Sequence, residues 1–192
     1  GHHGVTIFFV LSGFLIGGIY YKKENISASK FWLSRFLRTY PPYFVMLLVS
    51  WLAVYLTRKE PFDLGFLLLI QNFYKEIPYF LVSWSLAVEE HFYLLFALLI
   101  ICITNKKTQY YFWVSLSVLP ALLRILFYKE TGEFGFYKTA SFLHIDSLAT
   151  GVVLAYLVHI KKISINSKSW ASIMSIVLML VLFYFISKYE KE

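Results

Sequence analysis

Most of the residues that could do chemistry in this 192-residue chain lie inside long apolar stretches. The ionisable residues within or beside these stretches are Glu89, Glu90, His91, Arg124, His144 and Asp146. A charged group in hydrocarbon costs several kcal/mol unless it is paired or hydrated, so such residues indicate function by default. Arg124 could neutralise one of the acids, and each histidine could be a base, a ligand or a packed polar residue. Structural ion pairs, or side chains snorkelling from helix ends, would produce the same pattern.

Two arginines stand just before another apolar stretch. Arg35 and Arg38 are three residues apart, so a helix would place them on one face. Two guanidinium groups at the entrance to a membrane span suit a phosphate ligand, although ordinary anchoring at the membrane surface would also place bases there. No metal site is predicted, because no two histidines are spaced i,i+4 and Cys102 is the one cysteine.

Small residues mark the first apolar stretch. Gly13 and Gly17 form a small-xxx-small pattern, which allows another helix to approach closely. Ser12 beside them could bond back to its own helix or across to a neighbouring helix, or merely pack. In the apolar stretch that contains Glu89 and Glu90, Ser85 and Glu89 are four residues apart and would share a helix face.

The composition identifies the elements that must position these groups. Hydrophobic residues make up 59% of the chain and charged residues 15%, against about a quarter charged in an average soluble domain. A soluble enzyme, a disordered chain, a fibrous protein and a disulfide scaffold are therefore excluded. The sequence predicts an all-α, polytopic transmembrane helical bundle whose partner is the lipid bilayer.

Six stretches are long enough to cross a bilayer, which takes about 20 apolar residues. They are 4–21, 40–57, 80–103, 110–128, 140–160 and 169–187. The apolar run between Asp63 and Lys75 would make only about 16 Å of helix, so it is predicted to be re-entrant or interfacial.

The net charge of +7 is concentrated in alternate loops. The loops 22–39, 104–109 and 161–168 contain ten bases and one acid, whereas the other loops and ends contain seven of each. The positive-inside rule then places the basic loops in the cytoplasm and both ends of the chain outside. The charge therefore reflects orientation in the membrane, and no nucleic-acid partner is predicted.

Four blocks, in their order along residues 4–160, resemble the signatures of one family. Gly4–Ile16 is similar to G-V-x-x-F-F-x-L-S-G-F-L-I, and Arg35–Tyr43 is similar to R-x-x-R-x-x-P-x-Y. Trp84–Tyr93 is similar to W-S-L-x-x-E-x-x-F-Y. The fourth block is similar to R-x-D-x-L-x-x-G, with His144 where the family has arginine, followed by Asp146. The chain thus resembles the membrane acyltransferase 3 family of bacterial O-acyltransferases.

The resemblance implies a multi-pass enzyme of the inner (plasma) membrane that uses cytoplasmic acetyl-CoA or another acyl-CoA. The acyl group would pass to a hydroxyl of a cell-surface carbohydrate or glycoconjugate acceptor. By the same resemblance, Arg35 and Arg38 would bind the coenzyme A phosphates, while Glu89, Ser12 and Asp146 would be catalytic.

The family also has a first helix in which an arginine is followed eleven residues later by the histidine base. That helix would precede Gly4. Residues 1–192 are therefore expected to be a single, partial transmembrane acyltransferase domain that lacks the first and last helices and is inactive alone.

Two rival functions fit the same residues. A proton-coupled transporter or flippase could use the intramembrane acids, and a non-catalytic membrane subunit would need only the packing. Neither the acceptor nor the acyl chain length follows from the sequence.

Overall fold

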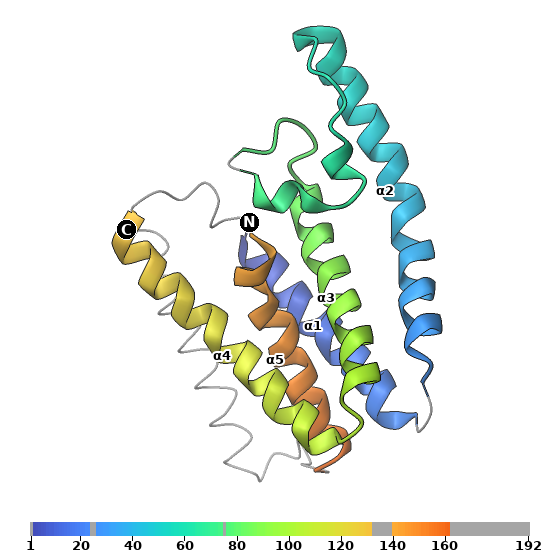
Figure 1. Ribbon diagram of the computed structural model, residues 1–192, viewed down its shortest axis with the longest axis vertical. Helices are drawn as coiled ribbons and strands as arrows, with labels where there is room; N and C mark the ends of the chain where they lie inside the picture. The colour runs from blue at the N-terminus through green and yellow to red at the C-terminus, as the bar shows by residue number, and fades with distance from the viewer. Residues whose placement is uncertain (1, 24–25, 75, 132–139, 162–192) are drawn as a thin grey trace.

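The computed structural model describes residues 2–23, 26–74, 76–131 and 140–161, with side chains from Gly4 onward and those of 124–131 excepted (Figure 1). In these ranges the chain forms helices and no strands, as expected for an all-α bundle. The elements are α1 (His2–Lys22), α2 (Ala28–Arg58), the short 3-10 helices η1 (Leu64–Phe66) and η2 (Ile70–Phe73), α3 (Ser83–Cys102), α4 (Lys106–Thr131) and α5 (Ser141–His159).

Four of the helices in the described part are long and apolar enough to cross a membrane. They are α1 from Gly4, α2, α3 and α5, which correspond to four of the expected spans. Helix α4 covers the expected span 110–128. The expected span 169–187 lies outside the described residues.

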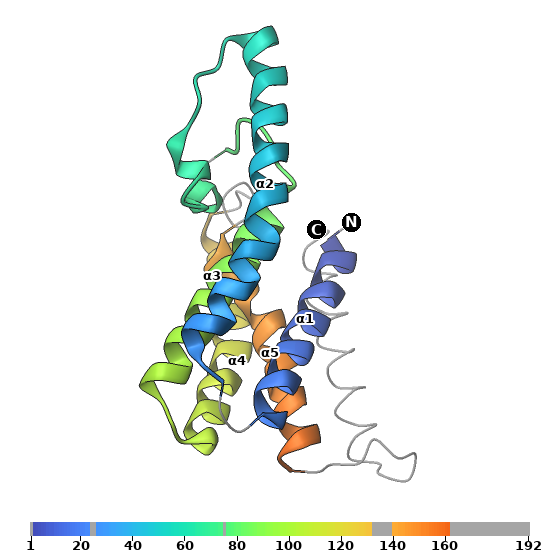
Figure 2. The same ribbon diagram turned by 90° about the vertical axis from the view of Figure 1, so that its right-hand side faces the viewer.

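Successive long helices run in opposite directions along the bundle, and α1 and α5 lie side by side (Figures 1 and 2). The end of α1, the start of α4 and the end of α5 therefore meet at one end of the bundle. The described lysines at or near this end include Lys22, Lys23, Lys30, Lys106, Lys107 and Lys161. This arrangement matches the predicted clustering of basic residues on one membrane face.

The second span begins earlier than predicted. The expectation was a loop over 22–39 and a span from residue 40, but α2 is one helix from Ala28 to Arg58. Its 31 residues are about 46 Å long, more than the hydrocarbon thickness. The bases before residue 40 led to the prediction of a loop. They are compatible with a helix, because long basic side chains can extend along it and place their charged groups at the membrane surface. Pro41 and Pro42 lie inside this helix, as membrane helices tolerate.

The short apolar run after α2 does not cross the bundle, as predicted. It leaves α2 and returns to α3 at the same end (Figure 1). Lys59, Leu69 and Phe80 adopt positive φ angles of 58°, 58° and 51°, which let the chain reverse over short distances. We call residues 59–82 the re-entrant segment.

Hydroxyl groups of α2 hold the re-entrant segment in place. Tyr40 donates to the carbonyl of Leu67 at 2.8 Å, and Tyr43 donates to the carbonyl of Phe66 at 2.7 Å. Within the segment, the Asp63 carboxylate accepts from the backbone of Gly65 at 2.7 Å. The segment is therefore packed against α2 and ordered by these hydrogen bonds.

Candidate functional site

The two adjacent acids of α3 are buried, with Glu89 6% and Glu90 5% exposed. Glu89 is six residues from the start of α3 at Ser83, which corresponds to about 9 Å of helix. A carboxylate at this depth has lost most of its water and needs compensating partners. The surrounding helices provide some of them.

Glu89 faces hydroxyl groups from two helices. Its carboxyl group interacts with Ser12 of α1 and with Tyr93, one turn further along α3. The hydroxyls of Ser12 and Tyr93 are themselves 3.2 Å apart. Within the described residues, Glu89 Oε1 is buried and has no hydrogen-bond partner, so one acceptor position of the carboxylate is unused.

Arg35 of α2 brings a positive charge to these acids. Its guanidinium carbon is 5.9 Å from the ring centroids of both Phe31 and Tyr93, within the range of cation–π attraction. Its charge acts on both Glu89 and Glu90. Helices α1, α2 and α3 thus converge on the Glu89 carboxylate, which we call the Glu89 site.

A hydroxyl group of α2 forms a hydrogen bond with Glu90. Thr39 donates to Glu90 Oε1, and its Oγ1 also lies 3.0 Å from the carbonyl oxygen of Arg35. Neither Thr39 nor Tyr93 was predicted to be a site residue. The available signal was their spacing, since Thr39 follows Arg35 by four residues and Tyr93 follows Glu89 by four.

The two arginines have different surroundings. Arg35 is half-buried beside the acids, whereas Arg38 is exposed on α2. Nothing in the structure tests phosphate binding by either residue, so their predicted role stays a prediction.

Asp146 is buried on α5, with 7% of its surface exposed. Ser147 Oγ lies 3.5 Å from its Oδ1, and Thr150 donates to its backbone carbonyl at 2.7 Å. The side chain of Arg124, the expected counter-charge, lies outside the described residues. The catalytic role predicted for Asp146 also stays a prediction.

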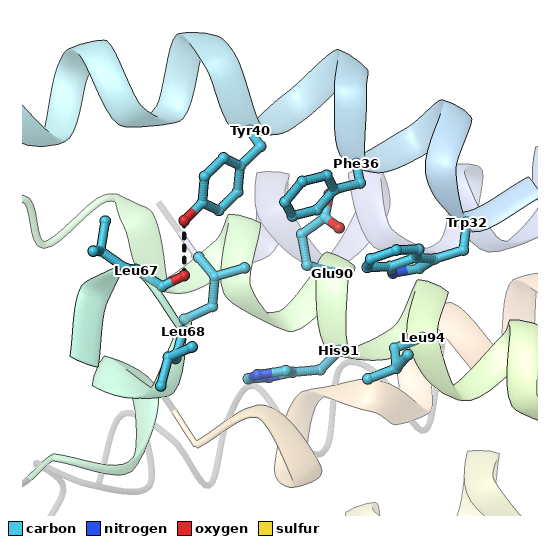
Figure 3. Close-up of a pocket in the computed structure, with 9 residues that line it drawn as sticks. Trp32, Phe36, Tyr40, Leu67, Leu68, Glu90, His91 and Leu94 are labelled. Atoms are coloured by element: carbon cyan, nitrogen blue, oxygen red, sulfur yellow. Dashed lines mark hydrogen bonds between the residues drawn. The ribbon is translucent and has the colours of Figure 1, made fainter. Parts of the chain in front are cut away.

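A pocket of about 150 Å³ lies between α2, the re-entrant segment and α3 (Figure 3). Its lining consists of Trp32, Phe36, Tyr40, Leu67, Leu68, Leu69, Glu90, His91 and Leu94. The three aromatic rings of α2 form a stack, with centroid distances of 5.1 Å and 4.4 Å. Glu90, His91 and the phenol of Tyr40 are the ionisable groups on this otherwise apolar surface, so the pocket suits a mainly apolar ligand with a polar end.

Two tyrosines of the re-entrant segment are less acidic than usual. Burial raises the pKa of Tyr74, and its hydrogen bond to Asp63 raises it further. Burial also raises the pKa of Tyr79, whose hydroxyl accepts from the Asp63 backbone at 2.8 Å. Both phenols therefore keep their protons to a higher pH in the folded protein than in the unfolded chain.

In the part of the chain that the structure describes, no three histidine, cysteine, aspartate or glutamate residues group as metal ligands.

Comparison with known proteins places these features in a family. A family model described as an acyltransferase domain, the acyltransferase 3 model, matches residues 1–189. The peptidoglycan O-acetyltransferase OatA of Listeria monocytogenes is 28% identical over 99% of this chain and 36% of its own length. A Staphylococcus aureus (strain COL) protein, named "Putative O-acetyltransferase", is 27% identical over 82% of this chain and 30% of its own length.

An uncharacterized protein of Haemophilus influenzae is 31% identical over 93% of this chain and 84% of its own length. The chain spans about a third of the length of the Staphylococcus and Listeria relatives. No solved structure matches it. The family match over residues 1–189 shows that this chain belongs to the acyltransferase 3 family of membrane proteins.

Proposed function

We propose that the protein transfers an acyl group, acetyl by default, from acyl-CoA to a hydroxyl of a cell-surface carbohydrate. The observation that carries this proposal is the buried Glu89 carboxylate with a free acceptor position, surrounded by Ser12, Tyr93 and Arg35, in a chain of the acyltransferase 3 family. The relative OatA is named as a peptidoglycan O-acetyltransferase, which supports a carbohydrate acceptor.

The basic face of the bundle is the proposed entrance for the donor. Arg35 lies seven residues, about 10 Å, from the start of α2, at the end of the bundle where the lysines gather. Arg38 is exposed and available to a phosphate, and guanidinium groups bind phosphates in a bidentate manner. We assign both residues to the coenzyme A phosphates, and the basic face to the cytoplasmic side of the inner (plasma) membrane.

The reaction requires a bond exchange at the thioester carbon. The acceptor hydroxyl oxygen forms the new C–O bond, the C–S bond breaks, and the hydroxyl proton ends on the departing thiol. Glu89 would accept a hydrogen bond at its free oxygen and so orient the acceptor or a base. Ser12 would fix the position of that carboxylate, and Asp146 of α5 would act from the neighbouring helix.

Radiolabelled acetyl transfer by the full-length protein in membranes tests the role of Glu89. Glu89→Gln keeps the shape of the side chain but removes its charge. We expect transfer to fall by about 100-fold, in the range typical of a lost acid–base or orienting group. Leu98→Ala, an exposed position on the same helix, is the matched control and should keep its activity. Full activity in Glu89→Gln would contradict the proposal.

The donor site is tested by measuring the affinity for a coenzyme A analogue. Arg35→Ala and Arg38→Ala should each weaken binding about 10- to 100-fold, as expected for a lost hydrogen bond to a charged group. Lys30→Ala removes an exposed base from the same helix and is the control. Unchanged affinity in both arginine variants would contradict the assignment of these residues to the coenzyme A phosphates. A protein that binds no coenzyme A yet conducts protons would instead support a transporter.

A further inference from the structure

A buried amide fixes the orientation of one hydroxyl group next to the pocket. Asn72 of η2 is fully buried, and its Nδ2 lies 2.8 Å from the carbonyl oxygen of Trp84. Since that oxygen only accepts, the Asn72 amide must present its NH2 group there. The second hydrogen of the same group is donated to Ser141 Oγ, at 2.9 Å. Ser141 therefore accepts from Asn72, and its own hydrogen remains to be donated.

His91 of α3 is the acceptor for that hydrogen. Its Nδ1 lies 2.8 Å from Ser141 Oγ, and Ser141 is 2% exposed. A buried hydroxyl hydrogen without an acceptor is costly, so Ser141 donates to Nδ1. A neutral imidazole has one donor and one acceptor nitrogen. With Nδ1 accepting, the proton of neutral His91 is on Nε2.

In the described part of the chain, no residue accepts a hydrogen bond from the Nε2–H group. The Nε2 atom is also not buried, so it can reach a ligand. His91 is half-exposed and lines the pocket across from the rings of α2 (Figure 3). The pocket thus contains a fixed N–H donor beside an aromatic wall. A ligand with one acceptor oxygen and a short apolar chain fits both features.

On this basis, and resting on the proposed function, we propose that the pocket is the acyl subsite and that His91 Nε2–H donates a hydrogen bond to the carbonyl oxygen of the transferring acyl group. The alkyl end lies against Trp32 and Phe36. When the acceptor hydroxyl forms the C–O bond, the carbonyl electron pair moves onto that oxygen, and the N–H group stabilises it. The pair returns as the C–S bond breaks, and the sulfur leaves with the proton lost by the hydroxyl.

His91 is thus a donor rather than a base, and its substitutions distinguish the two roles. Gln presents an amide N–H in place of Nε2–H, whereas Leu has none. We expect kcat for acetyl transfer to fall by about 100-fold in His91→Leu, the loss typical of one removed oxyanion donor, with KM nearly unchanged. We expect His91→Gln to stay within about 10-fold of the wild type. An equal loss in both variants would show a base and overturn the proposal, as would full activity in His91→Leu.

Ser141 is a positioning residue in this scheme and gives a second test. Ser141→Ala frees Nδ1 and lets the proton occupy either nitrogen, so kcat should fall about 10-fold with KM unchanged, whereas Ser141→Thr keeps the hydroxyl and should restore it. A loss of equal size in Ser141→Thr would contradict the orienting role. The control is again Leu98→Ala.

The apolar wall predicts a preference for chain length. Phe36→Ala enlarges the pocket and should raise kcat/KM for butyryl-CoA relative to acetyl-CoA at least about 10-fold, because the space left by the ring admits the longer alkyl chain. An unchanged ratio would place the acyl chain elsewhere. If the wild-type protein transfers no acyl group, the proposed function itself fails. If the wild type transfers normally and these variants do not differ from it, only the acyl subsite fails.

Discussion

The contact between α1 and α5 and the contact between α2 and α3 are built in opposite ways. Helices α1 and α5 touch through their backbones, because a Cβ atom at Gly13 would overlap the carbonyl of Leu148, and one at Gly151 would overlap that of Val10. Helix α2 instead stands away from α1 and α5 (Figure 2) and meets its neighbours through side chains such as Thr39.

Burial along the helices differs mainly between α1 and α2. In α1 28% of the most apolar stretch is buried, against 11% in α2, whereas α3 and α5 each have half of theirs buried. A ligand between α2 and α3 would have to displace only side chains, whereas the α1–α5 contact has no room for one. The pocket lies between α2 and α3, and the Glu89 site lies where α1, α2 and α3 converge.

The largest loss of stability is expected when a side chain is added at the contact between α1 and α5. Gly13→Ala places a methyl group against the Leu148 backbone, which cannot move aside as a flexible side chain would. We expect the free energy of unfolding to fall by about 3 kcal/mol, the upper end of the usual range for overpacking. Thermal unfolding in detergent measures the loss. Gly4→Ala is the control, because a Cβ there meets nothing within 4 Å.

A smaller loss is expected at the contact between α2 and α3. Thr39→Val removes the hydroxyl that donates to Glu90 and leaves a buried carboxylate oxygen without its partner. The expected cost in unfolding free energy is about 1–3 kcal/mol, typical of an unsatisfied buried polar group. Thr57→Val on the same helix removes a hydroxyl that bonds only to its own helix, and should change little. Equal losses at both positions would contradict the distinction between the two contacts.

The smallest effect is expected in the re-entrant segment and depends on pH. The folded-state pKa values of Tyr74 and Tyr79 are raised above the ordinary value of 10.0, so the neutral phenols stabilise the fold. This contribution is complete below about pH 10 and is lost as the pH rises through the folded-state pKa values. Replacing both residues by Phe should flatten the fall in unfolding free energy that begins near pH 10, the pKa of the unfolded tyrosines.

Tyr111→Phe is the control for this pH dependence, since Tyr111 is 59% exposed on α4. If the double variant and the control lose stability in parallel as the pH rises, the phenols of Tyr74 and Tyr79 do not contribute.

Much of the architecture could be predicted from local patterns. Apolar length predicted the membrane helices, the shortness of the run after Asp63 predicted a segment that turns back, and Gly13 predicted a close helix contact. The start of α2 could not be predicted, because bases within its first turns look like a loop when the sequence is scored for hydrophobicity alone. Their long side chains make a helix and a surface position compatible.

The site was predictable only in part. Glu89 stood out because an ionisable residue in an apolar stretch is unusual in itself. Arg35 stood out because it is paired with Arg38 three residues later, just before a predicted span. Thr39, Ser141 and His91 act through hydrogen bonds between residues about 50 positions apart, such as the bond from Thr39 to Glu90 and that between His91 and Ser141. No local periodicity encodes such pairs.

The sequence by itself determined that this is a helical membrane protein with its bases gathered on one face. Hydrophobic transfer and charge placement add up residue by residue, and a count along the chain therefore captures them. Only the tertiary structure decided that Ser12 and Tyr93 meet Glu89, and that Ser141 meets His91. Those outcomes depend on how far each helix is rotated and how closely it approaches its neighbours, which is set by packing across the whole bundle.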